Sequence, residues 1–162
     1  MTRAPWAIVD IDGVIADVRH RLRFLEGATR DWDGFFAAAV EDVPLEPGRA
    51  QIVAALSEGC RLAYLTGRPE RCRRSTQTWL RDHRFPDGPL HMRGDHDRRP
   101  ARIYKIDTLR GLAREAAIDR VIDDDPAVVR AMREAGFRVI HATWMSDAQE
   151  ALLEAQESEG RT

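Results

Sequence analysis

Cysteines and long hydrophobic runs are both scarce in this chain of 162 residues. Its two cysteines, Cys60 and Cys72, are too few for a disulfide framework, so we expect both to be reduced. No apolar run approaches the roughly 20 residues that cross a bilayer, and the first residues lack the apolar segment of a signal peptide. These absences predict a cytoplasmic protein that does not bind a membrane.

Lysine is rarer still, because Lys105 is the only one and arginine supplies every other strong positive charge. The net charge is −2, but it is unevenly distributed. Residues 68–102 contain ten arginines and five acidic residues, a net charge of +5 that leaves about −7 for the rest of the chain. A basic band on a mildly acidic protein favours an anionic substrate.

The stretch WAIVDIDGV at 6–14 carries the first sign of chemistry. A short β-rich run that ends abruptly in charge is typical of a buried parallel strand. Asp10 and Asp12 follow it, at the strand end where open α/β sheets bind ligands. In extended chain their side chains face the same way, and a hard divalent cation such as Mg²⁺ relieves their repulsion. Gly13 then permits a sharp turn.

Strand and helix patterns alternate along the rest of the chain, which predicts an α/β fold with a parallel sheet covered on both faces. Further strands are expected at 61–65, 90–92, 120–122 and 137–140. Helices are expected at 47–57, 69–83, 102–116, 127–135 and 146–157, with Asp125 and Ser146 as N-caps. Residues 17–43 predict a flap too small for a domain, so we expect one domain over 1–162.

Polar residues stand at the ends of three expected strands, and the fold would bring them to one edge of the sheet. They are Asp10 and Asp12, then Thr66, Gly67 and Arg68, and finally Asp123, Asp124 and Asp125. Lys105 begins a helix just after the third strand and can reach the same edge. Each motif alone is also typical of an ordinary turn, cap or surface lysine. Their joint occurrence favours a catalytic site.

These motifs resemble those of the haloacid dehalogenase (HAD) superfamily of phosphohydrolases. In order they are DIDGV at 10–14, TGR at 66–68, Lys105 and the pair at 123–124. The resemblance implies a three-layer Rossmann-like fold, a five-stranded parallel sheet in the order 5-4-1-2-3, a minimal cap and a bound Mg²⁺. Within the superfamily the chain is most similar to the 3′-phosphatase domains of bacteriophage-type polynucleotide kinases. That similarity rests on Met92-Arg93, Asp95, the arginine-rich loop 98–102 and the segments 103–105 and 121–129.

The resemblance implies a role for each motif. Asp10 would attack phosphorus and form an aspartyl-phosphate, and Asp12 would act as the acid and base, with nearby like charge helping it to hold a proton. The metal ligands would be Asp10, the Asp12 carbonyl and Asp124, and Asp123 would orient Lys105 or a metal-bound water. Thr66 and Lys105 would bind the phosphoryl oxygens. Gly67, Arg68 and Arg93 would bind substrate.

The motifs indicate a phosphatase but are compatible with several classes of substrate. The small flap predicts an open site, which favours a nucleic-acid 3′ end whose phosphates contact Arg68 and Arg93. Residues 31–36 offer either an aromatic surface for a base or a buried helix start. No GxxxxGK[ST] phosphate loop is present, so we expect no kinase half and a separate kinase or ligase partner. The alternatives are a phosphatase for a free nucleotide or small metabolite, an idle phosphate-binding or partner-binding domain, and a response-regulator-like receiver.

Overall fold

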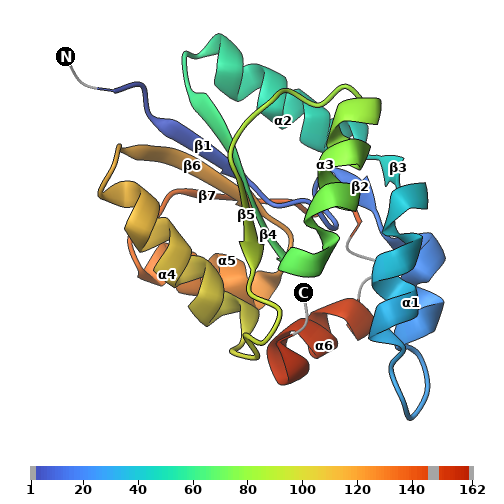
Figure 1. The fold of residues 1–162 in the computed structure, drawn as a ribbon. Coiled ribbons are helices and arrows are strands. Elements are labelled where there is room, and N and C mark those ends of the chain that lie inside the picture. Colours follow the sequence, from blue (N-terminus) through green and yellow to red (C-terminus); the bar gives the residue numbers. More distant parts are fainter. Residues whose placement is uncertain (1–2, 146–149, 161–162) are drawn as a thin grey trace.

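The computed structural model describes residues 3–145 and 150–160, and a five-stranded parallel sheet forms its centre (Figure 1). The strands of this sheet are β1 (Trp6–Val9), β4 (Arg61–Pro69), β5 (Leu90–Arg93), β6 (Ile118–Asp123) and β7 (Val139–His141). They lie in the order β5-β4-β1-β6-β7. The predicted α/β class is therefore confirmed.

The strand labels differ from the predicted order because two further strands form a sheet of their own. These are β2 (Ala16–Asp17) and β3 (Val43–Pro44), which pair antiparallel. Counted without them, the main sheet reads 3-2-1-4-5, which is the predicted order seen from the other edge. β1 is the central strand, with β4 and β6 beside it. The ends of these three strands therefore lie next to one another.

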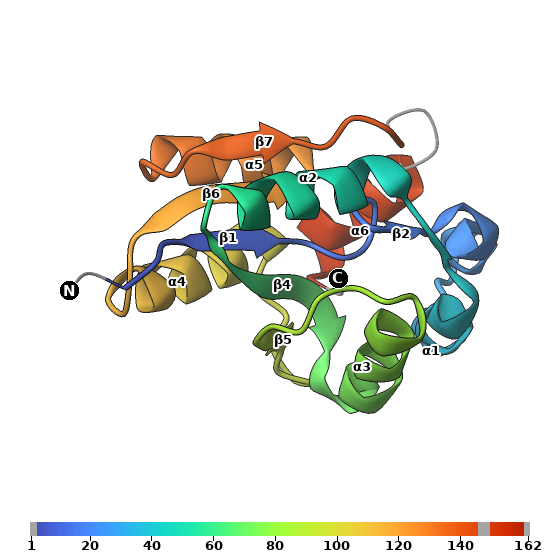
Figure 2. The same ribbon diagram turned by 90° about the horizontal axis from the view of Figure 1, so that it is seen from above.

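Helices cover both faces of the sheet, as Figures 1 and 2 show. One face carries α2 (Glu46–Ser57) and α3 (Arg73–Asp82), and the other carries α4 (Ala101–Ala113) and α5 (Pro126–Glu134). Adjacent residues of a strand point to opposite faces, so the short β1 contributes to both cores. Ile8 packs with Val128 of α5, whereas Val9 packs with Ile52 of α2 and Trp79 of α3.

The insertion, residues 17–43, folds back over the sheet end rather than extending from it. It contains the 3-10 helices η1 (Arg19–Leu25) and η2 (Ala38–Glu41), with α1 (Trp32–Ala37) between them. Trp32, Phe35 and Phe36 are buried and share a core with Leu152 of α6 (Glu150–Glu159). The aromatic stretch therefore belongs to the core and does not form an exposed aromatic surface. Figure 2 shows α1 and α6 beyond the carboxyl ends of β1 and β4.

Several element boundaries differ from those predicted. α3 begins at Arg73 rather than residue 69, because β4 continues through Pro69 and a 3-10 turn, η3 (Glu70–Cys72), follows it. Asp125 caps α5 as predicted, since its side chain accepts a hydrogen bond from the Ala127 amide at 2.8 Å. The predicted cap Ser146 lies outside the described residues. Within those residues, no helix has the length and apolar character needed to cross a membrane.

Candidate active site

The pair Asp10 and Asp12 follows β1 directly, at the carboxyl edge of the sheet. Hydrogen bonding of the Asp10 amide to the Ile122 carbonyl (3.0 Å) continues the contact with β6 past the end of the strand. Gly13 then has a φ of 76°, a conformation that favours glycine, so the chain turns sharply as predicted. Gly48 lets α2 approach this turn, because a Cβ there would lie 2.0 Å from the Val14 carbonyl oxygen. The turn is thus held from both sides.

One half of the site, here called the lysine side, consists of Asp10, Lys105, Asp123 and Asp124. Lys105 reaches from the second turn of α4 and donates to Asp10 Oδ2 at 2.9 Å and to Asp123 Oδ2 at 2.6 Å. The remaining oxygens, Asp10 Oδ1 and Asp123 Oδ1, accept the amides of Ile11 (2.7 Å) and Asp125 (3.1 Å). Two carboxylates from two strand ends therefore meet at one ammonium group, and the carboxylate of Asp124 lies close to both.

The lysine side has the composition of a divalent-cation site. One oxygen from each of Asp10, Asp123 and Asp124 lies within 4.8 Å of the others, and all three residues are buried. Both carboxylate oxygens of Asp124 are buried without a hydrogen-bond partner among the described residues. A buried carboxylate without partners is costly, and oxygen ligands of this kind suit a hard cation. The residues present therefore fit a divalent metal ion.

Burial and mutual repulsion make the lysine side reluctant to carry its full negative charge. Burial raises the pKa of Asp10 to about 7, with Asp123 adding to the rise and Lys105 opposing it. Burial and the charges of Asp10 and Asp123 also raise the pKa of Asp124 well above its usual range. Burial alone would lower the pKa of Lys105, but Asp10 and Asp123 outweigh it and raise that pKa. A bound cation would favour the charged carboxylates.

The other half, here called the arginine side, consists of Asp12, Arg21, Arg68 and Asp42. Asp12 Oδ1 accepts hydrogen bonds from Arg21 Nη2 at 2.7 Å and from Arg68 Nε at 3.0 Å and Nη2 at 2.5 Å. Behind the arginines, Asp42 accepts Arg21 Nε (2.8 Å) and Nη2 (2.7 Å) and Arg68 Nη2 (2.9 Å). Two buried cations and two buried carboxylates thus balance one another.

The electrostatic prediction for Asp12 is wrong. Burial would raise its pKa, but the charges and hydrogen bonds of Arg21 and Arg68 outweigh burial and lower it to about 2. Like charge from Asp10 does not dominate, because the arginines contact Asp12 Oδ1 directly. The second oxygen, Asp12 Oδ2, is buried and has no hydrogen-bond partner within the described chain. It is the atom of Asp12 that remains available to a substrate.

The remaining predicted residues lie on β4 and β5. Thr66 and Gly67 are buried in β4, and Thr66 Oγ1 accepts the Arg68 amide at 3.2 Å. The side chain of Arg93, at the end of β5, donates to the Arg99 carbonyl at 2.7 Å and lies over the Tyr104 ring. Arg68 and Arg93 are each only 1% exposed. Both guanidinium groups are therefore buried, although most arginines in proteins are exposed to solvent.

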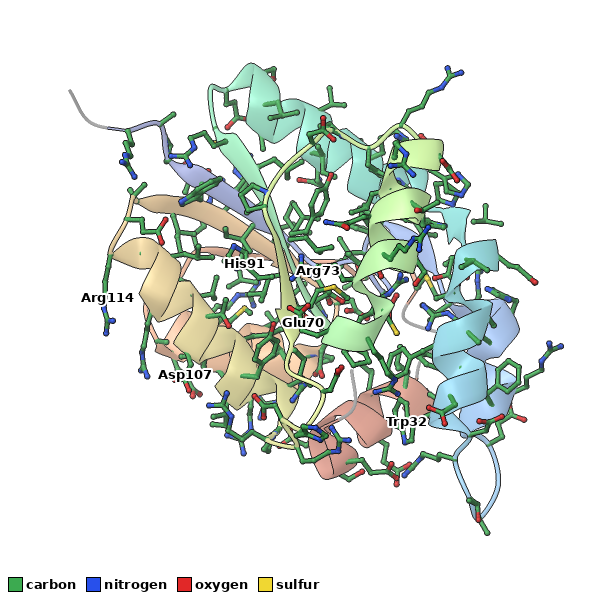
Figure 3. The ribbon with its side chains drawn as sticks, viewed as in Figure 1. Trp32, Glu70, Arg73, His91, Asp107 and Arg114 are labelled. Carbon is green, nitrogen blue, oxygen red and sulfur yellow. The ribbon has the colours of Figure 1, made fainter. Side chains whose placement is uncertain are left out.

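The site is also less open than the sequence predicts. Asp10, Asp12, Thr66, Lys105 and the pair at 123–124 are all 3% exposed or less. The physical reason is the insertion, which supplies Arg21 and Asp42 to the site and covers it. In Figure 3, Trp32 lies between α1 and α6, and its indole nitrogen donates to Glu159 at 2.7 Å. The covering elements are thus tied to each other.

Sequence reasoning missed Arg21 and Asp42, the two members of the arginine side that come from the insertion. No periodic pattern marks them, because Arg21 lies in the 3-10 helix η1 and Asp42 in the short link before β3. His20 also reaches this pair, since its Nε2 lies 2.8 Å from Asp42 Oδ1. Only their position in the sequence could have indicated them, because charged residues in the insertion that follows Asp10 and Asp12 can fold back against these two aspartates.

A nucleophile-type aspartate beside a lysine, a carboxylate cluster that fits a cation, and a Rossmann-like sheet define a phosphatase of the HAD superfamily. The chain belongs, more narrowly, to the family described as the polynucleotide kinase PNKP phosphatase domain, whose model matches residues 5–144. This membership rejects the receiver and the idle-domain alternatives. No curated protein sequence matches the chain.

Solved structures share the fold at low sequence identity. A chain of the Pnkp1/Rnl/Hen1 complex has a TM-score of 0.72 and 22% identity, over 86% of this chain and 45% of that one. The HAD-like protein SP0104 from Streptococcus pneumoniae has a TM-score of 0.59 and 14% identity, over 96% and 92% of the two chains. The HAD hydrolase YfnB from Bacillus subtilis, bound to magnesium, has a TM-score of 0.58 and 12% identity, over 85% and 88%. The chain thus spans less than half of the Pnkp1-complex chain.

Proposed function

We propose that this chain is a Mg²⁺-dependent phosphomonoesterase that removes the 3′-phosphate from a polynucleotide end through a phosphorylated Asp10. The division of labour between two neighbouring aspartates carries the proposal. Asp10 lies among carboxylates that fit a cation, while Asp12 presents an oxygen without a partner inside the described structure. Membership in the PNKP phosphatase-domain family supports the choice of substrate.

In the first half-reaction, a carboxylate oxygen of Asp10 bonds to phosphorus while the bond from phosphorus to the 3′-oxygen breaks. The leaving oxygen takes a proton from Asp12 Oδ2. An anionic phosphoryl group beside Asp12 opposes the two arginines and raises the affinity of Asp12 for that proton. Thr66, the Gly67 backbone and Lys105 bind the phosphoryl oxygens.

In the second half-reaction, water attacks phosphorus, the bond to the Asp10 oxygen breaks, and the proton of the water passes to Asp12 Oδ2. Arg21 and Arg68 favour the ionised form of Asp12, which is the form that accepts this proton. Asp42 holds both arginines in place from behind. Because Arg68 and Arg93 are buried, we propose that they act on the terminal phosphate inside the site.

Asp10, Asp124 and the Asp12 carbonyl would hold Mg²⁺, with Asp123 beside them. The ion would supply positive charge that reduces repulsion between the Asp10 carboxylate and an anionic phosphate. The unpartnered oxygens of Asp124 support this assignment, and the magnesium in YfnB supports the choice of ion. Lys105 already contacts both Asp10 and Asp123, so its ammonium group can shift between these two carboxylates when a cation binds beside them.

The likeness to a chain of the Pnkp1/Rnl/Hen1 complex supports a separate kinase or ligase that acts on the same ends.

The burial of Asp10 and Asp12 favours a second candidate, a phosphatase for a free nucleotide or another small phosphorylated metabolite. A small molecule enters a covered site more easily than a polymer does.

Phosphate release with Mg²⁺ from a matched set of substrates tests the proposal. The set contains 3′- and 5′-phosphorylated oligonucleotides of one sequence, 3′- and 5′-mononucleotides, and an aryl phosphate. We expect the highest kcat/KM for the 3′-phosphorylated oligonucleotide. A higher value for a mononucleotide would favour the second candidate, and equal values for the 3′ and 5′ ends would contradict the proposed substrate.

A further inference from the structure

Arg68 and Arg93 already have partners inside the protein and do not reach the outer part of a polynucleotide substrate. Arg68 is paired with Asp12 and Asp42, and Arg93 donates to the Arg99 carbonyl. Both side chains are buried. If the substrate is a polynucleotide, as the proposed function holds, its remaining phosphates lie outside the site and need other cations.

Two hollows lie beside the site and meet at one side chain, Arg71. The first, of about 540 Å³, is bordered by Arg30 and Asp33 of the insertion, Asp95 and Arg98 of the loop after β5, and Arg71. Arg71 lies in η3, the turn that follows β4, and Asp95 lies two residues after the end of β5. Because those strand ends form the catalytic edge, this hollow lies at that edge, and we infer that it is the mouth of the site.

The second hollow, of about 440 Å³, runs along one face of α3. Its lining includes Arg71 of η3, and also Arg74, Thr78 and Asp82, which recur at the four-residue spacing of one face of α3. Val40 of η2, whose surface is 55% exposed, forms the opposite wall. This second hollow is thus a groove that runs from Arg71 along α3, with positive charge at its near end and Asp82 at its far end.

Only some of the arginines around this path are free to bind a strand. Arg30 pairs with Glu159, and Arg98 donates to the carbonyls of Asp95 (2.8 Å) and Asp97 (3.2 Å). Arg73 pairs with Glu70, beside it at the start of α3 (Figure 3), and donates to the Leu90 carbonyl at 3.0 Å. These three side chains are committed to other partners.

Arg71 and Arg74 differ from them. Arg71 Nη2 lies 3.2 Å from Asp33, whose side chain is 93% exposed, and ion pairs of that kind contribute little. Arg74 is exposed and makes no ion pair within residues 3–145 and 150–160. Arg71 lies in η3 and Arg74 lies in the first turn of α3, three residues further along the chain. They form a pair of available cations at the exit of the site.

We propose that Arg71 and Arg74 bind the backbone phosphates of the substrate strand that immediately precede the phosphorylated 3′ end. The strand leaves the mouth past Arg71 and enters the groove along α3. Contacts with phosphates add affinity without reading the base sequence. Because Asp82 lies at the far end of the groove, the favourable contacts end there and the benefit of a longer strand saturates after a few nucleotides.

The test compares 3′-phosphorylated oligonucleotides of one, two, four and eight nucleotides, using the double variant Arg71→Gln/Arg74→Gln. Its matched control is Arg114→Gln, which also removes an exposed arginine but lies at the distant end of α4 (Figure 3). We expect the double variant to lower the ratio of kcat/KM for the octamer over that for the mononucleotide about tenfold. The salt dependence of the octamer reaction should weaken by about 0.7 in logarithmic slope for each lost contact.

Arg74→Gln alone guards against a folding defect, since Arg74 makes no ion pair in the described parts of the chain. It should show part of the loss, while Arg114→Gln keeps the parent ratio and slope. A parent protein that prefers oligonucleotides, together with a double variant that matches Arg114→Gln, would overturn this inference and leave the proposed function intact. A parent protein without any preference for the octamer over the mononucleotide would overturn the proposed function instead.

Discussion

Asp10 and Asp12 stand two residues apart in the sequence, yet they lie in opposite electrostatic environments. On the lysine side, Lys105 pairs with two of three buried carboxylates, and the pKa of Asp10 rises to about 7 as a result of burial and repulsion. On the arginine side, Arg21 and Arg68 outweigh burial and lower the pKa of Asp12 to about 2. One half has too much negative charge and the other is balanced.

This difference separates a half that fits a cation from a half whose charges already balance. The lysine side gains from a bound cation, because its carboxylates repel one another and Asp124 has unpartnered oxygens. The charges of the arginine side are balanced without a ligand, because every charged group in it meets an opposite charge. Removing a carboxylate should therefore stabilise the metal-free lysine side and destabilise the arginine side.

The largest effect is expected from Asp10→Asn, which removes the proposed nucleophile. Turnover should fall by at least about 10⁴-fold, as losses of covalent nucleophiles do. In Mg²⁺-free buffer the variant should be as stable as the parent or more stable, because one of three clustered carboxylates loses its charge. Phosphate release and urea unfolding measure the two quantities. Measurable turnover near the parent rate would reject the role of Asp10.

Asp12→Asn should slow turnover by about 10²–10⁴-fold, the usual contribution of an acid and base. Unlike the first variant, it should also lose about 3–5 kcal/mol of unfolding free energy, because two buried arginines keep only Asp42 as a carboxylate partner. Urea unfolding of both variants under the same conditions gives the contrast directly. Equal stabilities for the two variants would contradict the distinction between the sides.

Mg²⁺ should stabilise the parent protein by about 2.7 kcal/mol at a concentration one hundred times its Kd. Asp124→Asn should remove most of this gain, because both carboxylate oxygens of Asp124 lack other partners among the described residues. Asp87→Asn is the control, since Asp87 is an exposed carboxylate in the turn before β5. Thermal unfolding with and without Mg²⁺ measures the gain. A full gain in Asp124→Asn would mean that the ion binds elsewhere.

Arg21→Lys keeps the positive charge of the arginine side but loses the two-pronged contact with Asp42. We expect kcat to fall about tenfold with a much smaller change in the affinity for Mg²⁺, because Arg21 does not contact the lysine side. Steady-state kinetics and metal titration separate these effects. An equal loss in metal affinity would show that the two sides are coupled.

The smallest effect is expected from His20→Asn. His20 contacts Asp42 from the outer edge of the arginine side, and its side chain is about one-third exposed. Contacts of this exposure contribute about 0–1 kcal/mol. Unfolding and kinetics should therefore remain close to those of the parent. A large loss of stability or activity would show that His20 is also part of the arginine side.

The sheet and its catalytic edge could be predicted because the relevant signals are local. Alternating strand and helix patterns predict the parallel sheet, and short polar stretches such as those at 10–12 and 123–125 fall where strands end. Capping chemistry at Asp125 depends on the next few residues alone, and the structure confirms it. Such features need no knowledge of distant parts of the chain.

The environment of Asp12 could not be predicted in the same way. It depends on Arg21 and Asp42, which reach the site only because the insertion folds back and packs against α6. A buried arginine and a surface arginine look alike in a sequence, so the burial of Arg68 was equally invisible. The sign of a pKa shift depends on such contacts and therefore required the structure.

Trapping the phosphorylated enzyme tests the central claim most directly. Asp12→Asn is mixed with Mg²⁺ and a radioactive aryl phosphate, whose leaving group departs without the proton of Asp12, then quenched in acid, digested and mapped. The division of roles predicts label on the peptide that contains Asp10, because the base needed to hydrolyse the intermediate is missing. The label should be absent from a variant that also carries Asp10→Asn. Phosphate release without any protein-bound label, or label on another residue, would contradict the account.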